Sequence, residues 1–170
     1  MNDAVPQPAQ TYLQLRDRIL SLNPSEMGLV PSRLAPHVWG VVMETGYPVG
    51  SATLVCLADG TTSLYFSTGG GILGSSEYTP IAEASRALVT LAESNLQHAS
   101  LTHEFPLPEV GQVRFILLTY SGLFTGEAPQ RTLAVGDHEL STLYLKAQEI
   151  LEQLRLLAEK KPTIHSRSKF

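Results

Sequence analysis

The spacing of apolar residues changes along the chain, and each change marks a new element. Residues 11–22 carry an apolar stripe at helical spacing, formed by Leu15, Ile19 and Leu22. Thr11 and Gln14 fit a capping box, in which the two side chains satisfy free backbone N–H groups at a helix start. Pro24 disfavours a helical residue before it. The pattern therefore predicts a first helix over residues 11–22.

Three strands are expected next, because runs rich in β-branched and aromatic residues are separated by turn signals. The predicted strands cover 37–44, 49–58 and 61–67. Residues 45–48 form the first turn. Asp59-Gly60 is the strongest hairpin signal, since both residue types tolerate positive φ. The second and third strands are therefore expected to pair as a hairpin.

The second half of the chain repeats this alternation of helix and strand. Thr79 and Pro80 suit the N-cap and the first position of a helix, and Asp137 is a plausible N-cap for the last helix. The expected elements are a glycine-rich loop over 68–76, a helix over 80–96, paired strands over 101–107 and 112–120, a bent strand over 121–127, and a helix over 137–159.

Both faces of the predicted strands are apolar, which indicates a sheet covered on both sides. Strict alternation places Val38 and Val42 on one face, and Trp39, Val41 and Met43 on the other. The same alternation sets Val55 and Leu57 against Ala52, Leu54 and Cys56, and Phe115 and Leu117 against Ile116 and Leu118.

The order α-β-β-β-α-β-β-α with hairpin connections predicts an α+β fold with a mainly antiparallel sheet of about five strands. We expect a three-layer α/β/α sandwich, with the second helix on one face and the first and third on the other. This element order is similar to the profilin-like and roadblock-like arrangement. The similarity concerns the fold alone and implies no function.

The length of 170 residues suits one domain. We expect a mobile N-terminal arm over 1–10, a single α+β domain over 11–160 and a frayed basic tail over 161–170. The start of the chain lacks the basic and apolar segments of a signal peptide. No apolar run approaches the length of a membrane span. The expected location is the cytoplasm, without a membrane partner.

The proportion of charged residues and the net charge indicate which partners the chain can bind. Only 16% of the residues are charged against 43% hydrophobic, so polar cover for the surface is limited and a homodimer is expected. The last helix has a stripe wide enough for sheet packing and, as the less favoured alternative, for a dimer seam. A net charge of −4 argues against a nucleic-acid partner, which requires a basic face.

The titratable residues form no recognisable catalytic or metal motif. Cys56 lies among apolar neighbours and is expected to be a buried core residue. The spacing of the histidines matches no standard zinc motif, and His138-Glu139 lacks the second histidine of a metalloprotease helix. The histidines are His37, His98, His103, His138 and His165. No catalytic residue, metal or cofactor is predicted.

The glycine-rich segment is the one candidate ligand site. Glycine lets a backbone approach a ligand closely and turn its N–H groups toward it. Three of the glycines match G-x-G-x-x-G, but the helix begins too late for a dinucleotide fingerprint. A plain crossover that needs positive φ remains the favoured interpretation. The candidate ligand residues are Ser67, Thr68, Gly69, Gly70, Gly71, Gly74, Ser75 and Ser76.

These observations favour a non-enzymatic protein-interaction or regulatory module, expected to be homodimeric. The first alternative is a small-ligand or phosphoester-binding domain, with or without enzymatic activity, built on residues 67–76. The second alternative is a chaperone-like protein that handles a segment of another protein. A pocket with convergent polar groups over the glycine loop would favour a ligand. A broad apolar face would favour a protein partner.

Overall fold

The computed structural model describes residues 5–74 and 77–160. Our expectations for the start of the arm, for Ser75 and Ser76, and for the tail over 161–170 lie outside the described residues. The elements are α1 (Gln10–Leu20), a short 3-10 helix (Pro24–Met27), β1 (Val38–Tyr47), β2 (Gly50–Leu57), β3 (Thr62–Phe66), β4 (Gly71–Ile72), α2 (Thr79–Asn95), a second 3-10 turn (Leu96–His98), β5 (Ser100–Leu101), β6 (Gln112–Thr119), β7 (Gly122–Pro129), α3 (Gln130–Ala134) and α4 (Ser141–Lys160).

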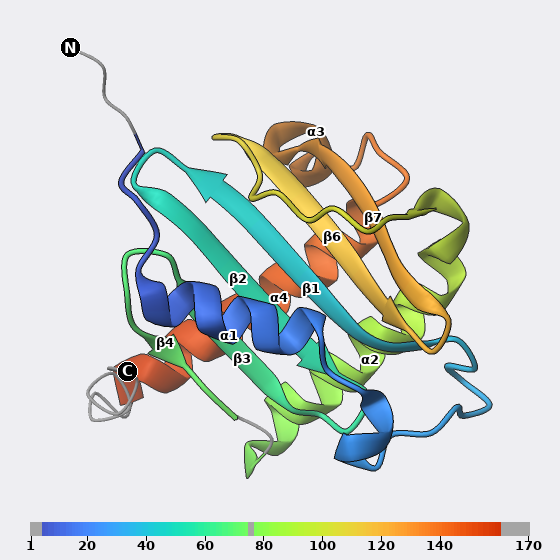
Figure 1. Ribbon diagram of the computed structural model, residues 1–170. Helices are drawn as coiled ribbons and strands as arrows, with labels where there is room; N and C mark the ends of the chain where they lie inside the picture. The colour runs from blue at the N-terminus through green and yellow to red at the C-terminus, as the bar shows by residue number, and fades with distance from the viewer. Residues whose placement is uncertain (1–4, 75–76, 161–170) are drawn as a thin grey trace.

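One antiparallel sheet forms the centre of the molecule (Figure 1). Its order is β4-β3-β2-β1-β6-β7-β5. Strand β1 therefore lies at the centre, with β2 to β4 on one side and β5 to β7 on the other. The α+β class and the antiparallel sheet are confirmed. The sheet has seven strands rather than about five, because the two-residue strands β4 and β5 extend its edges beyond the longer strands.

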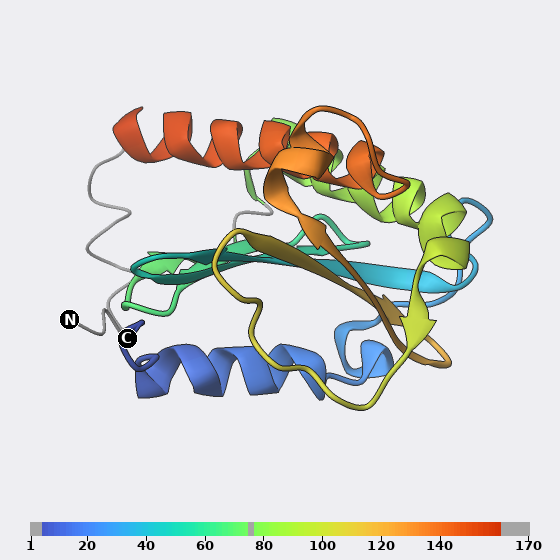
Figure 2. The same ribbon diagram turned by 90° about the horizontal axis from the view of Figure 1, so that it is seen from above.

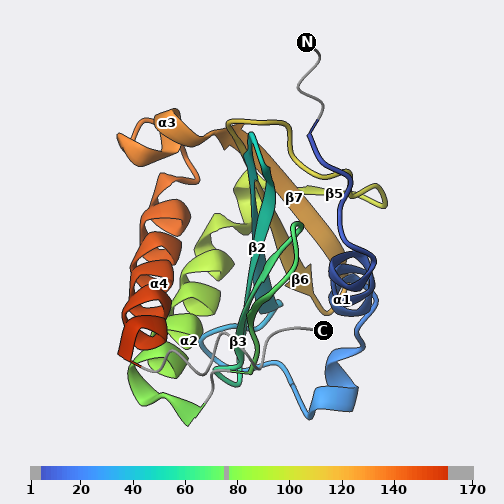
Figure 3. The same cartoon turned by 90° about the vertical axis from the view of Figure 1, so that its left-hand side faces the viewer.

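Helices cover both faces of the sheet, but their distribution differs from our expectation. Figures 2 and 3 show α2 and α4 together on one face and α1 alone on the other. The expectation that the last helix shares a face with the first is therefore wrong. Tyr144 and Ala158, which widen the stripe of α4, are buried in the core between α2, α4 and the sheet. The wide stripe thus serves packing within the chain, while Leu145 and Leu156 of the same helix remain exposed.

The side chains of β1 do not alternate strictly between the two faces. The β1–β6 register shifts between Val38 and Gly40. Val38 therefore joins Val41 and Met43 on the α2 and α4 side, while Trp39 joins the α1 side. Our placement of Val38 with Val42 is wrong, because a bulge inserts one residue into the alternation.

The alternation predicted for β2 and β6 is confirmed. Leu54, Cys56, Phe115 and Leu117 belong to the core on the α2 and α4 side. Their sequence neighbours belong to the core beneath α1, and these are Val55, Leu57, Ile116 and Leu118. Regular pairing with β1 leaves these strands without a bulge at those positions, so period two holds there.

Several predicted helix starts shift in the structure. The capping box of the first helix is wrong, because Ala9 is the N-cap and no side chain caps it. Tyr78 rather than Thr79 precedes α2, with Pro80 in its first turn. The last helix begins at Ser141, well after Asp137. Helix starts depend on where the preceding chain is held, and short-range sequence signals do not report this.

The predicted turns have mixed outcomes. The Asp59-Gly60 hairpin is confirmed, with Gly60 at φ +92° and the Leu57 amide donating to the Thr61 carbonyl at 2.9 Å. The first turn lies at 48–49 rather than 45–48, because β1 continues to Tyr47.

The predicted strand over 101–107 is wrong, since β5 ends at Leu101 and pairs with β7. The following segment instead crosses the α1 face of the sheet, where Phe105 and Leu107 pack on the core. Pro106 and Pro108 lack the N–H donors that a paired strand requires.

Candidate binding surface

A buried ion pair fastens α1 to the middle of the sheet. Arg16 on α1 is 7% exposed and Glu44 on β1 is fully buried. The Arg16 Nε donates to Glu44 Oε2 at 2.7 Å, and Nη2 donates to Oε1 at 2.8 Å. The same Nη2 donates to the Phe105 carbonyl at 2.6 Å. One guanidinium therefore holds both α1 and residues 102–111, which we call the crossing segment, on the sheet.

Two hydroxyl groups complete this network. Thr53 Oγ1 donates to Glu44 Oε2 at 2.9 Å. Because a hydroxyl has one proton, the Tyr12 hydroxyl is then the donor in its 2.7 Å bond to Thr53 Oγ1. Burial, followed by the negative charge of Glu44, raises the pKa of Tyr12 to about 12. Each polar group here has a partner inside the protein, so the network has a structural role and offers no free acid or base.

The polar row continues across the sheet. Glu44 is opposite Thr53 on β2 and Arg114 on β6, and Arg114 is opposite Glu127 on β7. Arg114 pairs with Glu127 and donates to the Pro106 carbonyl. The row thus anchors the crossing segment above β6 and β7. On the other half of this face, α1 is the one long helix among the described residues that covers the sheet (Figure 2).

An apolar groove lies beside α1. A helix is about 10 Å wide, whereas strands are spaced about 4.8 Å apart, so one helix covers about two strands. The remaining surface forms a hollow of about 220 Å³ with Leu15, Ile19 and Leu22 on one wall and Val55 and Leu57 on its floor. Met27 and Leu73 stand at its rim, 40% and 41% exposed.

A smaller hollow of about 80 Å³ extends the groove toward the β3–β4 turn. The two hollows share Leu15 and Tyr65 in their linings, so they adjoin. The half-exposed Phe66 also lines the smaller one. Together they run along the side of α1 that faces the β3–β4 edge. We call this combined hollow the α1 groove.

A few polar groups interrupt the apolar lining of the α1 groove. Arg18, Ser63 and Tyr65 all line the larger hollow. Burial raises the pKa of Tyr65, while a hydrogen bond with Ser63 and the nearby charge of Arg18 act in the opposite direction. Within the described residues, Arg18 forms no ion pair with a carboxylate. Among the described residues, the lining of the groove therefore presents hydrogen-bond donors and one cation, and it includes no acidic residue.

The glycine-rich segment forms the β3–β4 hairpin. The Phe66 amide donates to the Gly70 carbonyl at 3.1 Å, and the Gly69 amide donates to the Phe66 carbonyl at 2.9 Å. Gly71 pairs with Tyr65, and the Gly74 amide donates to Ser63 Oγ at 3.3 Å. These contacts use amides that an anion would need.

The polar side chains at the start of this segment differ in availability. Ser67 is buried, and its Oγ accepts the Ser51 amide at 2.7 Å. Its carbonyl accepts the Ala9 amide at 2.8 Å, so Ser67 has a structural role. Thr68 is exposed. Ser75 and Ser76 lie outside the described residues. The hollow beside Gly69 and Gly70 has a mainly apolar lining, and ligand binding at this segment stays a prediction.

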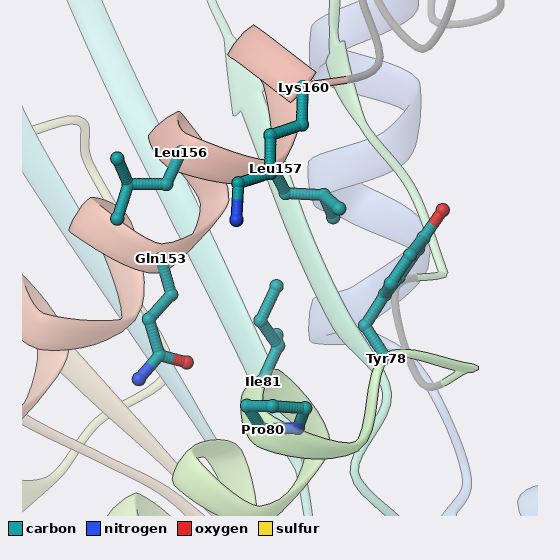
Figure 4. A pocket seen from close by; sticks show the side chains of 7 residues that line it. All are labelled: Tyr78, Pro80, Ile81, Gln153, Leu156, Leu157 and Lys160. Carbon is teal, nitrogen blue, oxygen red and sulfur yellow. The ribbon is translucent and has the colours of Figure 1, made fainter.

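A further cavity of about 230 Å³ separates the start of α2 from the end of α4 (Figure 4). Its walls are apolar, with Ile81 and Leu157 facing each other and Lys160 at the edge. Gln153 Oε1 is buried in this region without a hydrogen-bond partner among the described residues. Within the described lining, Lys160 and Tyr78 are the titratable groups.

The remaining candidates have structural contacts or are exposed, and His165 lies outside the described residues. Cys56 is buried, as expected, and burial raises the pKa of its thiol to about 12. His37 contacts Glu93, and His98 lies 3.1 Å from Glu139. His138 Nδ1 accepts the Leu140 amide at 3.0 Å. In the described ranges, no group of three His, Cys, Asp or Glu residues is placed to hold a metal ion.

Sequence reasoning missed the residues that shape this face. Arg16 recurs with Tyr12 and Ile19 on the buried side of α1, and Glu44 shares its strand face with Val42. Opposite charges at two expected core positions are a usable signal for a buried pair. The α1 groove itself has no linear signature, because α1, β2 and β3 each contribute only part of it.

Comparison with known proteins identifies no relative: no family model, no curated protein and no solved structure matches the chain. Among the described residues, none of the helices has both the length and the apolar character to cross a bilayer.

Proposed function

We propose that this chain is a non-enzymatic protein-interaction module that holds an extended apolar segment of another protein in the α1 groove. The observation that carries the proposal is the apolar hollow beside α1, where Met27 and Leu73 are exposed at the rim above the buried Val55 and Leu57. On the opposite face, two long helices cover the sheet. The buried polar row uses its own groups internally, which supports binding rather than chemistry.

The dimensions of the α1 groove suit a short extended segment. The 11 residues of α1 span about 16 Å at 1.5 Å per residue. Alternate side chains of an extended peptide lie about 7 Å apart, so two or three of them fit along the helix. Such a segment contributes side chains to a preformed hollow, as in other recognition of extended peptides.

The test is a selection of random-sequence peptides on phage with the full chain as bait, followed by NMR with a selected peptide. We expect amide shifts in α1, β2 and β3. Leu73→Asp should weaken binding about tenfold, because it places a carboxylate at the apolar rim. Leu145→Asp on α4 is the matched control, since Leu145 is 46% exposed and lies outside the groove. A failure to enrich any peptide, or shifts confined to other elements, would overturn the proposal.

Self-association belongs to the same proposal. Tyr47, Val49 and Val110 are large apolar residues exposed at one end of the sheet. The Gly111 amide donates to the Gly46 carbonyl at 2.8 Å, which brings the two segments together. This patch supports a homodimer. Sedimentation at micromolar concentration should find a dimer that Val49→Asp converts to a monomer, and a wild-type mass of 18.5 kDa would contradict it.

Two finer features complete the proposal. The profilin-like or roadblock-like arrangement is supported by the element order, and an experimental structure compared with members of those folds would test it.

A cytoplasmic location is supported by the single buried thiol of Cys56. Fractionation of the source cells would test the location.

A further inference from the structure

We infer that the α1 groove selects segments that carry a carboxylate among their apolar residues, with Arg18 as the residue that recognises it. This inference rests on the proposed function, since it specifies the partner of the same groove. The partner is an acidic, apolar segment of a protein chain. Its carboxylate is supplied by an Asp or Glu side chain or by a C-terminus.

The first argument is the charge of the lining. Arg18 is the cation of the larger hollow, and the described part of the chain contributes no Asp or Glu to that lining. Among the described residues, the arginines that pair with a carboxylate are Arg16, Arg114 and Arg155. Arg18 is left available for a partner from outside.

The second argument is the chemistry of the neighbouring groups. Tyr65 is buried, and it lines the same hollow as Ser63 and Arg18. A guanidinium offers several N–H donors, and the hydroxyls of tyrosine and serine can also donate. Donors that converge at one place in an apolar hollow favour an acceptor that carries negative charge.

The third argument is geometric. Leu15 and Ile19 are one helical turn apart on α1, and Leu22 follows the end of the helix. All three line the same hollow as Arg18. A bound segment therefore meets apolar contacts on both sides of the cation along α1. Its charged residue is expected to have apolar neighbours at alternate positions, since those positions share one side of an extended chain.

The test repeats the peptide selection with the full chain and with two charge-reversed variants. Wild-type selections should enrich peptides with an Asp or a Glu between apolar residues, or with a free C-terminus on an apolar residue. Arg18→Glu should instead enrich peptides with Lys or Arg at the same place. Arg131→Glu, an exposed residue on α3, is the matched control and should leave the acidic preference unchanged.

Affinities of one selected peptide complete the test. Replacement of its acidic residue by the matching amide should weaken binding about fivefold, the upper range for an accessible ion pair. Binding to the Arg18→Gln variant should not respond to this replacement. Apolar peptides that bind the wild type without charge preference, or that Arg18→Glu leaves unaffected, would overturn this inference and leave the proposed function standing. Absence of any enriched peptide would overturn both.

Discussion

The guanidinium of Arg16 donates two hydrogen bonds to the carboxylate of Glu44, at 2.7 and 2.8 Å, in the interior between α1 and the sheet. A buried charge pair contributes little net stability, because desolvation offsets the attraction. Loss of one partner is costly, since the other charge stays buried alone. The pair therefore fixes where α1 lies on the sheet, and with it the position of the α1 groove.

Removal of one charge of this pair should destabilise the protein strongly. We expect Glu44→Ala to lower the free energy of unfolding by about 3–5 kcal/mol. The double variant Arg16→Met with Glu44→Leu should recover at least half of that loss, because neither charge remains buried. Urea denaturation of the set measures the coupling. Arg155→Met, which breaks an exposed pair on α4, is the control and should change little. A double variant whose loss of stability equals the sum of the two single losses would contradict the coupling of the two charges.

Stability should decline at alkaline pH. The pKa of Tyr12 is raised from 10.0 to about 12 in the folded protein. A raised pKa means that the folded state retains the proton longer than the unfolded state. Its contribution is therefore complete below pH 10.0 and is lost as the pH rises toward about 12. Cys56 acts in the same direction, between 9.0 and about 12.

Two variants separate these alkaline contributions. Tyr12→Phe should lower the free energy of unfolding by about 1 kcal/mol at neutral pH, through the lost hydrogen bond to Thr53. It should also flatten the loss between pH 10 and 12. Cys56→Ala should remove only the loss of stability that comes from ionisation of the thiol. Denaturant unfolding at several pH values measures both, and unchanged alkaline slopes would show that the buried groups do not cause the decline.

Two neighbouring glycines should differ in their tolerance of a side chain. A Cβ at Gly71 would lie 2.0 Å from the Leu64 carbonyl oxygen, whereas a Cβ at Gly70 meets nothing within 4 Å. Both have positive φ, at +151° and +80°. We expect Gly70→Ala to cost about 1 kcal/mol for the strained backbone, and Gly71→Ala to cost at least about 3 kcal/mol because the strand must move. Equal losses by thermal denaturation would contradict this account of the hairpin.

The prediction that residues 67–76 bind an anion has its own measurement. Titration with phosphate, followed by NMR, would shift the amides of Gly69 and Gly74 if the segment binds it. Because both amides already donate within the protein, we expect no shift at millimolar phosphate. Shifts confined to this segment would favour the small-ligand alternative.

Removal of the unpaired amide oxygen of Gln153 should stabilise the protein. Its Oε1 is buried without a hydrogen-bond partner in the described part of the chain, and such a group costs free energy. Gln153→Leu keeps the size of the side chain and extends the apolar wall of the cavity beside Ile81. We expect a gain of about 1 kcal/mol by urea denaturation. Gln148→Leu, on the same helix, is the control, and an equal gain there would indicate a general effect of apolar substitution.

The sequence by itself determined the elements with strong local signals. Asp59-Gly60 specified a hairpin through its backbone preferences, and the alternation from Leu54 to Leu57 specified which side chains face each core. The helical stripe of α4 was visible for the same reason. These features depend on neighbours a few residues away, so period and turn chemistry are sufficient to predict them.

Only the tertiary structure decided how these elements combine. Local sequence does not encode whether α4 lies beside α2 or beside α1, because its stripe fits either face of an apolar sheet. The bulge between Val38 and Gly40 and the departure of 102–111 from the sheet depend on what each segment meets in space. The pairing of Arg16 with Glu44 and the α1 groove arise from residues far apart in the chain. Their contacts are set by long-range packing, which no local pattern contains.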